Sequence, residues 1–168
     1  MYKLTDSLPY LLNTIGVCLG EAFSAELSDH QLTLPMFRVL AALLQREEQR
    51  LGELSQMVRI EGSTLSRLVG TMKSRRLVSR RRQRGDERSV QISLTAEGRV
   101  LAERLVPRAV YYENLAVRNF DDASIDNLKE TLRKMQDNVA GLMGSAARRP
   151  ILDMTTKPSP RRKSAAKT

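Results

Sequence analysis

The stretch RRRQRGDERSVQISLT, residues 80–95, limits the possible folds more than any other part of the chain. Its second half alternates apolar Val90, Ile92 and Leu94 with polar residues, which is the two-residue period of a half-buried β-strand. The preceding LVSRRRQ forms the outgoing strand, and Gly85 supplies the backbone freedom that a tight turn needs. The stretch therefore predicts a β-hairpin with an arginine-rich tip.

Two short helical patterns precede this hairpin. LGELSQMV (51–58) and STLSRLVGTMKSRRL (63–77) each place apolar residues at helical spacing, and the turn RIEG separates them. Such a pair is typical of a helix-turn-helix. Another helix begins before it at the N-cap Thr33, and residues 46–50 are expected to form an exposed connection. The order predicts a winged helix-turn-helix over residues 33–95, in a fold that is mainly α with a small β-hairpin wing.

Three longer helical patterns lie outside this region, at residues 4–27, 96–119 and 124–143. The last repeats apolar residues at alternating steps of three and four, as in a coiled-coil seam. One protomer cannot bury all three apolar stripes against itself. Residues 147–168, rich in Pro, Ser, Thr and Lys, are predicted to be a disordered basic tail.

The distribution of charge points to a polyanionic partner. Residues 59–88 contain ten basic and three acidic residues, a net +7 within a chain of net +9. Residues 148–168 add a further +6, so the rest of the chain stands at −4. This asymmetry indicates nucleic acid or an anionic membrane surface, with a merely solvated face as the alternative.

Other features of the composition narrow the class of protein. The longest apolar runs are far too short to span a bilayer, and the N-terminus lacks the pattern of a signal peptide. A single cysteine cannot form an intrachain disulfide. We therefore expect a cytoplasmic protein that does not associate with membranes.

The order of elements and two motifs together resemble the MarR family of winged-helix regulators, over residues 5–143. STLSRLVGTMKSRRLVSR resembles the family's recognition helix and first wing strand. DERSVQISLTAEG resembles its wing pattern, at Asp86, Arg88, Leu94, Thr95 and Gly98. The chain departs from the family at Arg76, where a glycine is common. Because a non-glycine residue is strained in a left-handed helix cap, we expect the helix to end differently here.

The resemblance implies a set of DNA-contacting residues. The N-terminal part of the recognition helix would meet base edges in the major groove, through Ser63, Thr64, Ser66 and Arg67. Farther along this helix, Lys73 and Arg75 would meet phosphates. The wing would bring Arg82, Arg84 and Arg88 to the minor groove, with Asp86 holding Arg84 or Arg88 by an ion pair. The alternatives are helix capping for Ser63 and Ser66, and a surface ion pair of little value for Asp86.

The resemblance also implies a mode of action. The chain would be a homodimeric, sequence-specific regulator, more often a repressor, with residues 1–32 and 96–146 as its helical dimerisation region. A small aromatic acid or its conjugate would release it from a pseudo-palindromic operator. Candidate pocket walls are Phe23, Met36, Phe37, Arg38, Tyr111 and Tyr112, with Arg38 holding the carboxylate. The alternative for Phe23, Met36 and Phe37 is a place in the core.

Two rival readings stay open. The chain could be a sequence-tolerant architectural DNA binder, in which case its affinities for an operator and for random DNA would be similar. It could also be a redox-sensing regulator that uses Cys18, although the apolar context of this residue favours a buried spacer. We find no phosphate-binding glycine loop, no nucleophile with its base and no metal-ligand spacing around His30. We therefore expect neither an enzyme nor a bound cofactor or metal.

Overall fold

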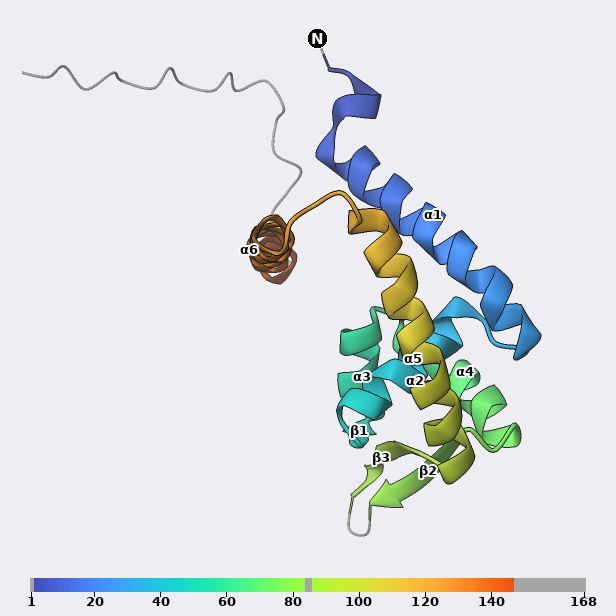
Figure 1. Cartoon of the computed structure of the whole chain (residues 1–168). Helices are drawn as coiled ribbons and strands as arrows, with labels where there is room; N and C mark the ends of the chain where they lie inside the picture. Colours follow the sequence, from blue (N-terminus) through green and yellow to red (C-terminus); the bar gives the residue numbers. More distant parts are fainter. Residues whose placement is uncertain (1, 84–85, 147–168) are drawn as a thin grey trace, which may run out of the picture. The chain divides into compact units, whose positions relative to one another are not determined.

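The computed structural model describes residues 2–83 and 86–146 and confirms a mainly helical winged helix-turn-helix fold with a small antiparallel sheet. The elements are a 3₁₀ helix η1 (Leu4–Asp6), α1 (Leu8–Asp29), α2 (Leu34–Gln45), β1 (Glu48–Arg50), α3 (Leu51–Val58), α4 (Gly62–Ser74), β2 (Val78–Gln83), β3 (Asp86–Leu94), α5 (Ala96–Val117) and α6 (Asp122–Ala146). The chain divides into two compact units after Arg118. In the first unit, the β2–β3 hairpin lies at the end remote from the N-terminus (Figure 1).

The core of the first unit is built around α2. Thr33 caps this helix as predicted, because its side chain accepts a hydrogen bond from the Met36 N–H at 3.4 Å. One face of α2 is buried, at Met36, Phe37, Val39, Leu40, Ala42 and Leu43. The neighbouring elements add Phe23, Leu27, Leu54, Val58, Leu65, Val69, Met72, Ile92, Ala102 and Leu105. This largely aliphatic cluster is the support on which α3, α4 and the hairpin rest.

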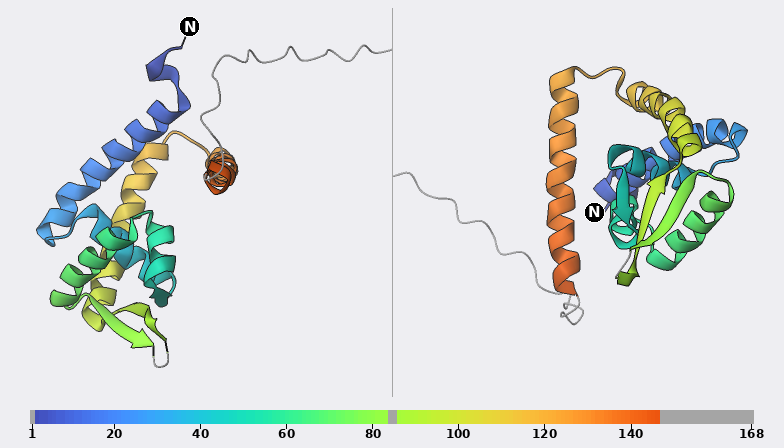
Figure 2. Two further views of the ribbon diagram at one scale, coloured as in Figure 1. Left: turned by 180° about the vertical axis from the view of Figure 1, so that it is seen from behind. Right: turned by 90° about the horizontal axis from the view of Figure 1, so that it is seen from below.

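The sheet has three antiparallel strands in the order β1–β3–β2, one more than the predicted hairpin. The expectation that residues 46–50 are an exposed connection is therefore wrong. Gln49 is buried opposite Ile92, and its Nε2 donates hydrogen bonds to the carbonyl oxygens of Ala42 at 2.8 Å and Arg46 at 3.3 Å. The Ala42 carbonyl also accepts from the Arg46 N–H, so the Gln49 side chain adds to the hydrogen bonds that end α2 and ties β1 to that helix. Figure 2 shows β2 and β3 side by side, with α4 running past them.

The end of α4, the two ends of the hairpin and the start of α5 meet at Leu77. The Thr95 N–H donates a hydrogen bond to the Leu77 carbonyl oxygen at 3.2 Å. The Thr95 Oγ1 donates to the Arg76 carbonyl oxygen at 2.5 Å and accepts from the Gly98 N–H at 3.0 Å. A Cβ on Gly98 would lie 1.9 Å from the Leu77 carbonyl oxygen. We call this set of contacts the Leu77 junction; it fixes α4, the hairpin and α5 relative to one another.

The expectation that Arg76 makes α4 end differently from a glycine-capped helix is wrong. This residue adopts the left-handed conformation, with φ of 57°, that a glycine would adopt. The Leu77 N–H donates to the Met72 carbonyl oxygen at 3.0 Å and the Arg76 N–H to that of Lys73 at 2.9 Å, which together form a Schellman cap. The helix thus ends in the manner of a glycine cap. The cost of roughly 1–2 kcal/mol for a residue with a Cβ is offset by the surrounding hydrogen bonds.

The first part of α1 is not covered by the first unit. Phe23 and Leu27 reach the core, whereas the earlier apolar side chains are exposed, at Leu8, Leu11, Leu12, Ile15 and Val17. Cys18 is exposed as well, so the expectation of a buried spacer is wrong for the single chain. The physical reason is that the core of this unit reaches only the C-terminal part of α1.

The second unit consists of α6 within the described residues. Asp121 precedes the helix, and its side chain accepts a hydrogen bond from the Ser124 N–H at 2.7 Å. The predicted seam residues with described side chains follow one another along the helix, at Ile125, Leu128, Leu132, Met135 and Val139. The predicted tail, 147–168, lies outside the described residues. Over the described ranges, no helix combines the length and the hydrophobicity that crossing a membrane requires.

The Leu77 junction makes Gly98 a residue that cannot be enlarged. We expect Gly98→Ala to lower the free energy of unfolding by about 1–3 kcal/mol or more, because the added Cβ meets backbone rather than a movable side chain. Gly52→Ala in α3 is the matched control, since a Cβ there has nothing within 4 Å. Thermal unfolding measures both variants. Equal melting temperatures for the two would contradict the rigid junction.

Candidate nucleic-acid interface

Helix α4 has one face in the core and one facing solvent. Leu65, Val69 and Met72 are fully buried. The residues that were predicted to contact DNA from the body of this helix are accessible: Ser63, Thr64, Arg67 and Lys73 are exposed and Ser66 is half-buried. In the described part of the chain, no ion pair engages the Arg67 guanidinium. The helix therefore presents a polar, partly basic face on a rigid apolar support.

The N-terminus of α4 is capped by Glu61, a residue that sequence reasoning did not select. Its carboxylate accepts hydrogen bonds from the Ser63 N–H at 2.9 Å and the Thr64 N–H at 3.1 Å, and also from the Ser63 hydroxyl. The side-chain bond from Ser63, followed by the two backbone bonds, lowers the pKa of this carboxyl from 4.5 to about 2. Glu61 is thus ionised at neutral pH.

This arrangement shows that Glu61, and not Ser63, is the N-cap of α4, while the predicted DNA contact of Ser63 stays a prediction. The cap is the side chain of Glu61, one residue before the helix, and Ser63 contributes by donating its hydroxyl hydrogen to that cap. The signal was present in the sequence, because an acidic residue directly before a helix suits the positive helix end. It was missed because glutamate is not among the preferred N-cap residues.

Arg75, which was predicted to meet a phosphate, has an internal role. Its guanidinium donates hydrogen bonds to the carbonyl oxygens of Gln31 at 2.5 Å and His30 at 3.0 Å. These carbonyls belong to the turn between α1 and α2, where Gln31 is left-handed with φ of 53°. Arg75 therefore ties the end of α4 to this turn. No local pattern in the sequence reveals a contact between residues 44 or 45 positions apart.

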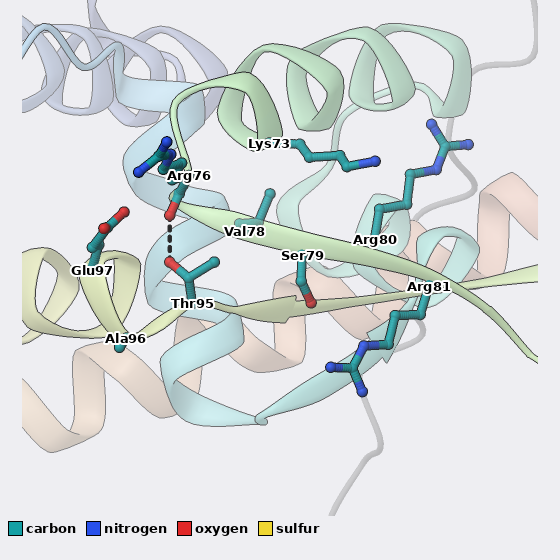
Figure 3. Close-up of a pocket in the computed structure, with 9 residues that line it drawn as sticks. All are labelled: Lys73, Arg76, Val78, Ser79, Arg80, Arg81, Thr95, Ala96 and Glu97. Atoms are coloured by element: carbon teal, nitrogen blue, oxygen red, sulfur yellow. Dashed lines mark hydrogen bonds between the residues drawn. The ribbon is translucent and has the colours of Figure 1, made fainter.

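A second group of basic side chains surrounds a hollow of about 530 Å³ beside the end of α4. Its charged lining consists of Lys73, Arg76, Arg80, Arg81 and a single acidic residue, Glu97. Figure 3 shows Lys73 and Arg80 extending on the same side of β2, while Arg81 leaves the strand in the opposite direction. The basic surface of α4 thus continues onto the hairpin. Such a surface suits the phosphodiester backbone.

The hairpin tip is the part of the predicted interface that the structure describes least. Arg82, Asp86 and Arg88 lie in β2 and β3, but their side chains are outside the described structure. Arg84 and Gly85 lie outside the described residues altogether. The minor-groove contacts and the ion pair of Asp86 stay predictions.

The predicted effector residues do not form one pocket. Phe23, Met36 and Phe37 are buried in the core, as their alternative reading stated. Phe23 packs edge-on against Phe37, with ring centroids 4.7 Å apart, and against Tyr112 at 5.6 Å. Tyr112 is half-buried and Tyr111 exposed. Phe23, Phe37 and Tyr112 are therefore part of the packing between α1, α2 and α5.

Arg38 lies elsewhere, on a hollow of about 510 Å³ between α1 and α2. Other residues of this hollow are Leu12, Asn13, Gly16, Val17, Gly20, Glu21, Ser24 and Leu34, so neither tyrosine lines it. Gly20 lets the two helices approach, because a Cβ there would lie 3.1 Å from Leu34. The hollow holds one guanidinium, that of Arg38, and one carboxylate, that of Glu21, among small, polar and apolar residues.

Comparison with known proteins gives a consistent result. A family model described as transcriptional regulator SarA/Rot matches residues 21–105. The HTH-type transcriptional regulator SarZ of Staphylococcus aureus (strain MRSA252) is 31% identical over 138 residues, which are 80% of this chain and 93% of SarZ. A MarR family transcriptional regulator from Silicibacter pomeroyi has a similar structure, with a TM-score of 0.74 and 27% identity, covering 82% of this chain and 92% of that chain.

A further structure with the same fold is that of BpsR from Bordetella bronchiseptica, whose DNA binding is regulated by 6-hydroxynicotinic acid. It has a TM-score of 0.73 and 26% identity, and the match covers 82% of this chain and 98% of BpsR. These proteins are transcriptional regulators and not enzymes. The similarity spans the accessible face of α4, the hairpin and the helices on either side. The chain therefore belongs to the MarR and SarA/Rot family of winged-helix, DNA-binding transcriptional regulators.

Proposed function

We propose that the protein is a homodimeric, sequence-specific repressor whose DNA binding is relieved by a small organic acid. The main support for sequence-specific DNA binding is the structure of α4. Leu65, Val69 and Met72 are fully buried, the opposite face is polar and accessible, and the basic hairpin follows directly through the Leu77 junction. A rigid helix with such a face fits the major groove, and an adjoining hairpin reaches the neighbouring minor groove.

Within this arrangement, Arg67 is the principal reading residue. Its guanidinium can donate two parallel hydrogen bonds to guanine, a contact that contributes about 1–3 kcal/mol of discrimination. Ser63, Thr64 and Ser66 lie beside it on the accessible side of α4. The hairpin arginines enter the minor groove, and Lys73 with the other basic residues of the hollow beside β2 neutralises flanking phosphates.

The dimer is supported by apolar side chains that the first unit leaves exposed. They come from the first part of α1 and the second part of α5, at Leu8, Leu11, Leu12, Ile15, Val110, Tyr111 and Leu115. Contiguous exposed apolar surface of this kind marks a protein interface. A second copy placed by twofold symmetry would present two α4 helices to half-sites about 34–36 Å apart.

The effector site in this proposal is the hollow between α1 and α2. Its volume of about 510 Å³ lies within the range of small-molecule pockets, and Arg38 offers a partner for a carboxylate. The similarity to BpsR supports an aromatic acid as the ligand class. α1 belongs to the proposed dimer interface, and α2 supports α3 and α4. A ligand between α1 and α2 would therefore favour one distance between the two α4 helices of the dimer. It would act through its different affinities for the two arrangements.

Selection of bound DNA from a random pool tests the proposed reading. We expect a pseudo-palindromic consensus and, in sedimentation, a dimer. Arg67→Ala should weaken binding to the selected site by about 10- to 100-fold while leaving affinity for random DNA nearly unchanged. Arg104→Ala, an exposed arginine of α5, is the control. A pool without consensus, or equal losses on both DNAs, would favour the architectural alternative.

Lys73 and Arg75 should respond differently, although both are basic residues at the end of α4. Lys73→Gln is expected to reduce the slope of log affinity against log salt by about 1, since a phosphate contact is lost. Arg75→Gln is expected to leave that slope unchanged and to lower the melting temperature, because its guanidinium holds the α1–α2 turn. DNA titrations at several salt concentrations, with thermal unfolding, separate the two. If Arg75→Gln reduced the salt slope of DNA binding and left the melting temperature unchanged, Arg75 would be a DNA-contacting residue.

The effector proposal is tested with 6-hydroxynicotinic acid and a panel of related aromatic acids. At least one acid should raise the melting temperature of the protein and weaken its binding to the selected DNA. Arg38→Gln should abolish both effects while DNA binding without the acid stays as in the wild type. If no acid changes DNA affinity, or if Arg38→Gln responds like the wild type, this site is not the effector site.

A further inference from the structure

We propose that Glu61, together with Ser63, reads a cytosine amino group in the major groove and is a specificity-determining residue of this regulator. The inference rests on the proposed placement of α4 in the major groove. It concerns a residue at the helix end that enters the groove first, because the N-terminal side chains of a recognition helix contact base edges.

The carboxylate of Glu61 is held in one orientation. The Ser63 N–H donates to both Oε1 and Oε2 at 2.9 Å, and the Thr64 N–H donates to Oε2 at 3.1 Å. The Ser63 hydroxyl donates to Oε2 as well. The group is nevertheless exposed at the surface. An ionised side chain that is both accessible and fixed needs little ordering when it meets a base.

After these contacts, Glu61 and Ser63 offer only hydrogen-bond acceptors to a further partner. A carboxylate has about four lone-pair positions and no hydrogen to donate. Most of the contacts fall on Oε2, whereas Oε1 shares a single N–H, so Oε1 retains acceptor capacity. The hydroxyl hydrogen of Ser63 is already used, and its oxygen therefore also presents lone pairs. The two side chains together form an acceptor-only patch.

The chemistry of the major groove then limits the matching base. Guanine and the oxygen of thymine present acceptors, which an acceptor-only patch repels. Adenine presents a donor beside an acceptor, whereas cytosine presents the amino group N4 alone. A carboxylate paired with Ser63 is thus matched best by cytosine.

Capping does not require a glutamate at this position, although Glu61 does cap α4. Serine, threonine, asparagine and aspartate cap helices better, and none of them reaches as far from the backbone. The segment 59–88 carries a net charge of +7, and a fixed negative charge within it weakens general attraction to phosphates. A residue that weakens binding to DNA in general but forms a hydrogen bond with one base increases the preference for sites that contain this base.

Two substitutions of Glu61 separate base reading from capping. Selection from a random pool should give a wild-type consensus with one cytosine per half-site that depends on Glu61. Glu61→Gln should shift that position toward adenine, because an amide pairs with adenine through two hydrogen bonds. Glu61→Ser should lose the preference at that position while keeping the wild-type melting temperature, because serine caps the helix and is too short to reach a base.

Competition binding gives the size of the effect. Replacing the cytosine should weaken wild-type binding by about tenfold or more and leave binding by Glu61→Ser unchanged. Glu103→Gln removes an exposed carboxylate from α5 and should retain the wild-type consensus. The consensus position that depends on Arg67 should persist in all Glu61 variants.

Retention of the same cytosine preference in Glu61→Ser or Glu61→Gln would overturn the inference and leave Glu61 as a helix cap. The same holds if every base position weakens equally, since that reports a loosened helix rather than a lost contact. A wild-type pool without any consensus would instead overturn the proposed sequence-specific function, and this inference with it. A consensus that depends on Arg67 but not on Glu61 separates the two failures.

Discussion

The contact of Gly98 with the carbonyl of Leu77 sets the geometry on which the DNA-binding surface depends. At this point the backbone of α5 touches the backbone that leaves α4, with no side chain between them. The capping hydroxyl of Thr95 bonds to the carbonyl next to it. Because proteins transmit displacement through such close-packed contacts, α4 and the hairpin move as one body with the start of α5. Two grooves can be matched at once only by elements whose separation is fixed.

The periodic parts of the sequence predicted most of this fold. Helical spacing located the helices, and the alternation around Ile92 located the central strand, because each pattern is local and repeats several times. Strand β1 was missed because its three residues, Glu-Gln-Arg, are all polar. Its pairing depends on a strand more than forty positions away, which no local period records. The cap at Arg76 was misjudged because propensity describes a residue alone, whereas hydrogen bonds within the last turn of α4 and from Thr95 hold Arg76 in place.

The candidate site was predictable to the extent that it follows the face of a single helix. Ser63, Thr64, Arg67 and Lys73 share the accessible side of α4 because helical spacing puts them there. Roles that depend on tertiary contacts could not be predicted from the sequence. The partners of Arg75 are distant in sequence, and the exposure of Cys18 follows from where the core ends. Phe23 and Phe37, which were assigned to an effector pocket, are core residues, since composition alone does not separate a pocket wall from a core.

Gln49 gives the small sheet a mechanical role. Its backbone belongs to β1, which pairs with the central strand, and its side chain is bonded to the last turn of α2. The hairpin is consequently joined to α2 through β1, which pairs with β3, and it contacts α4 through β2. Under the proposed effector mechanism, a shift of α2 would be passed to the hairpin through these Gln49 contacts. A ligand in the proposed site beside α2 would then change the angle at which the hairpin meets a duplex.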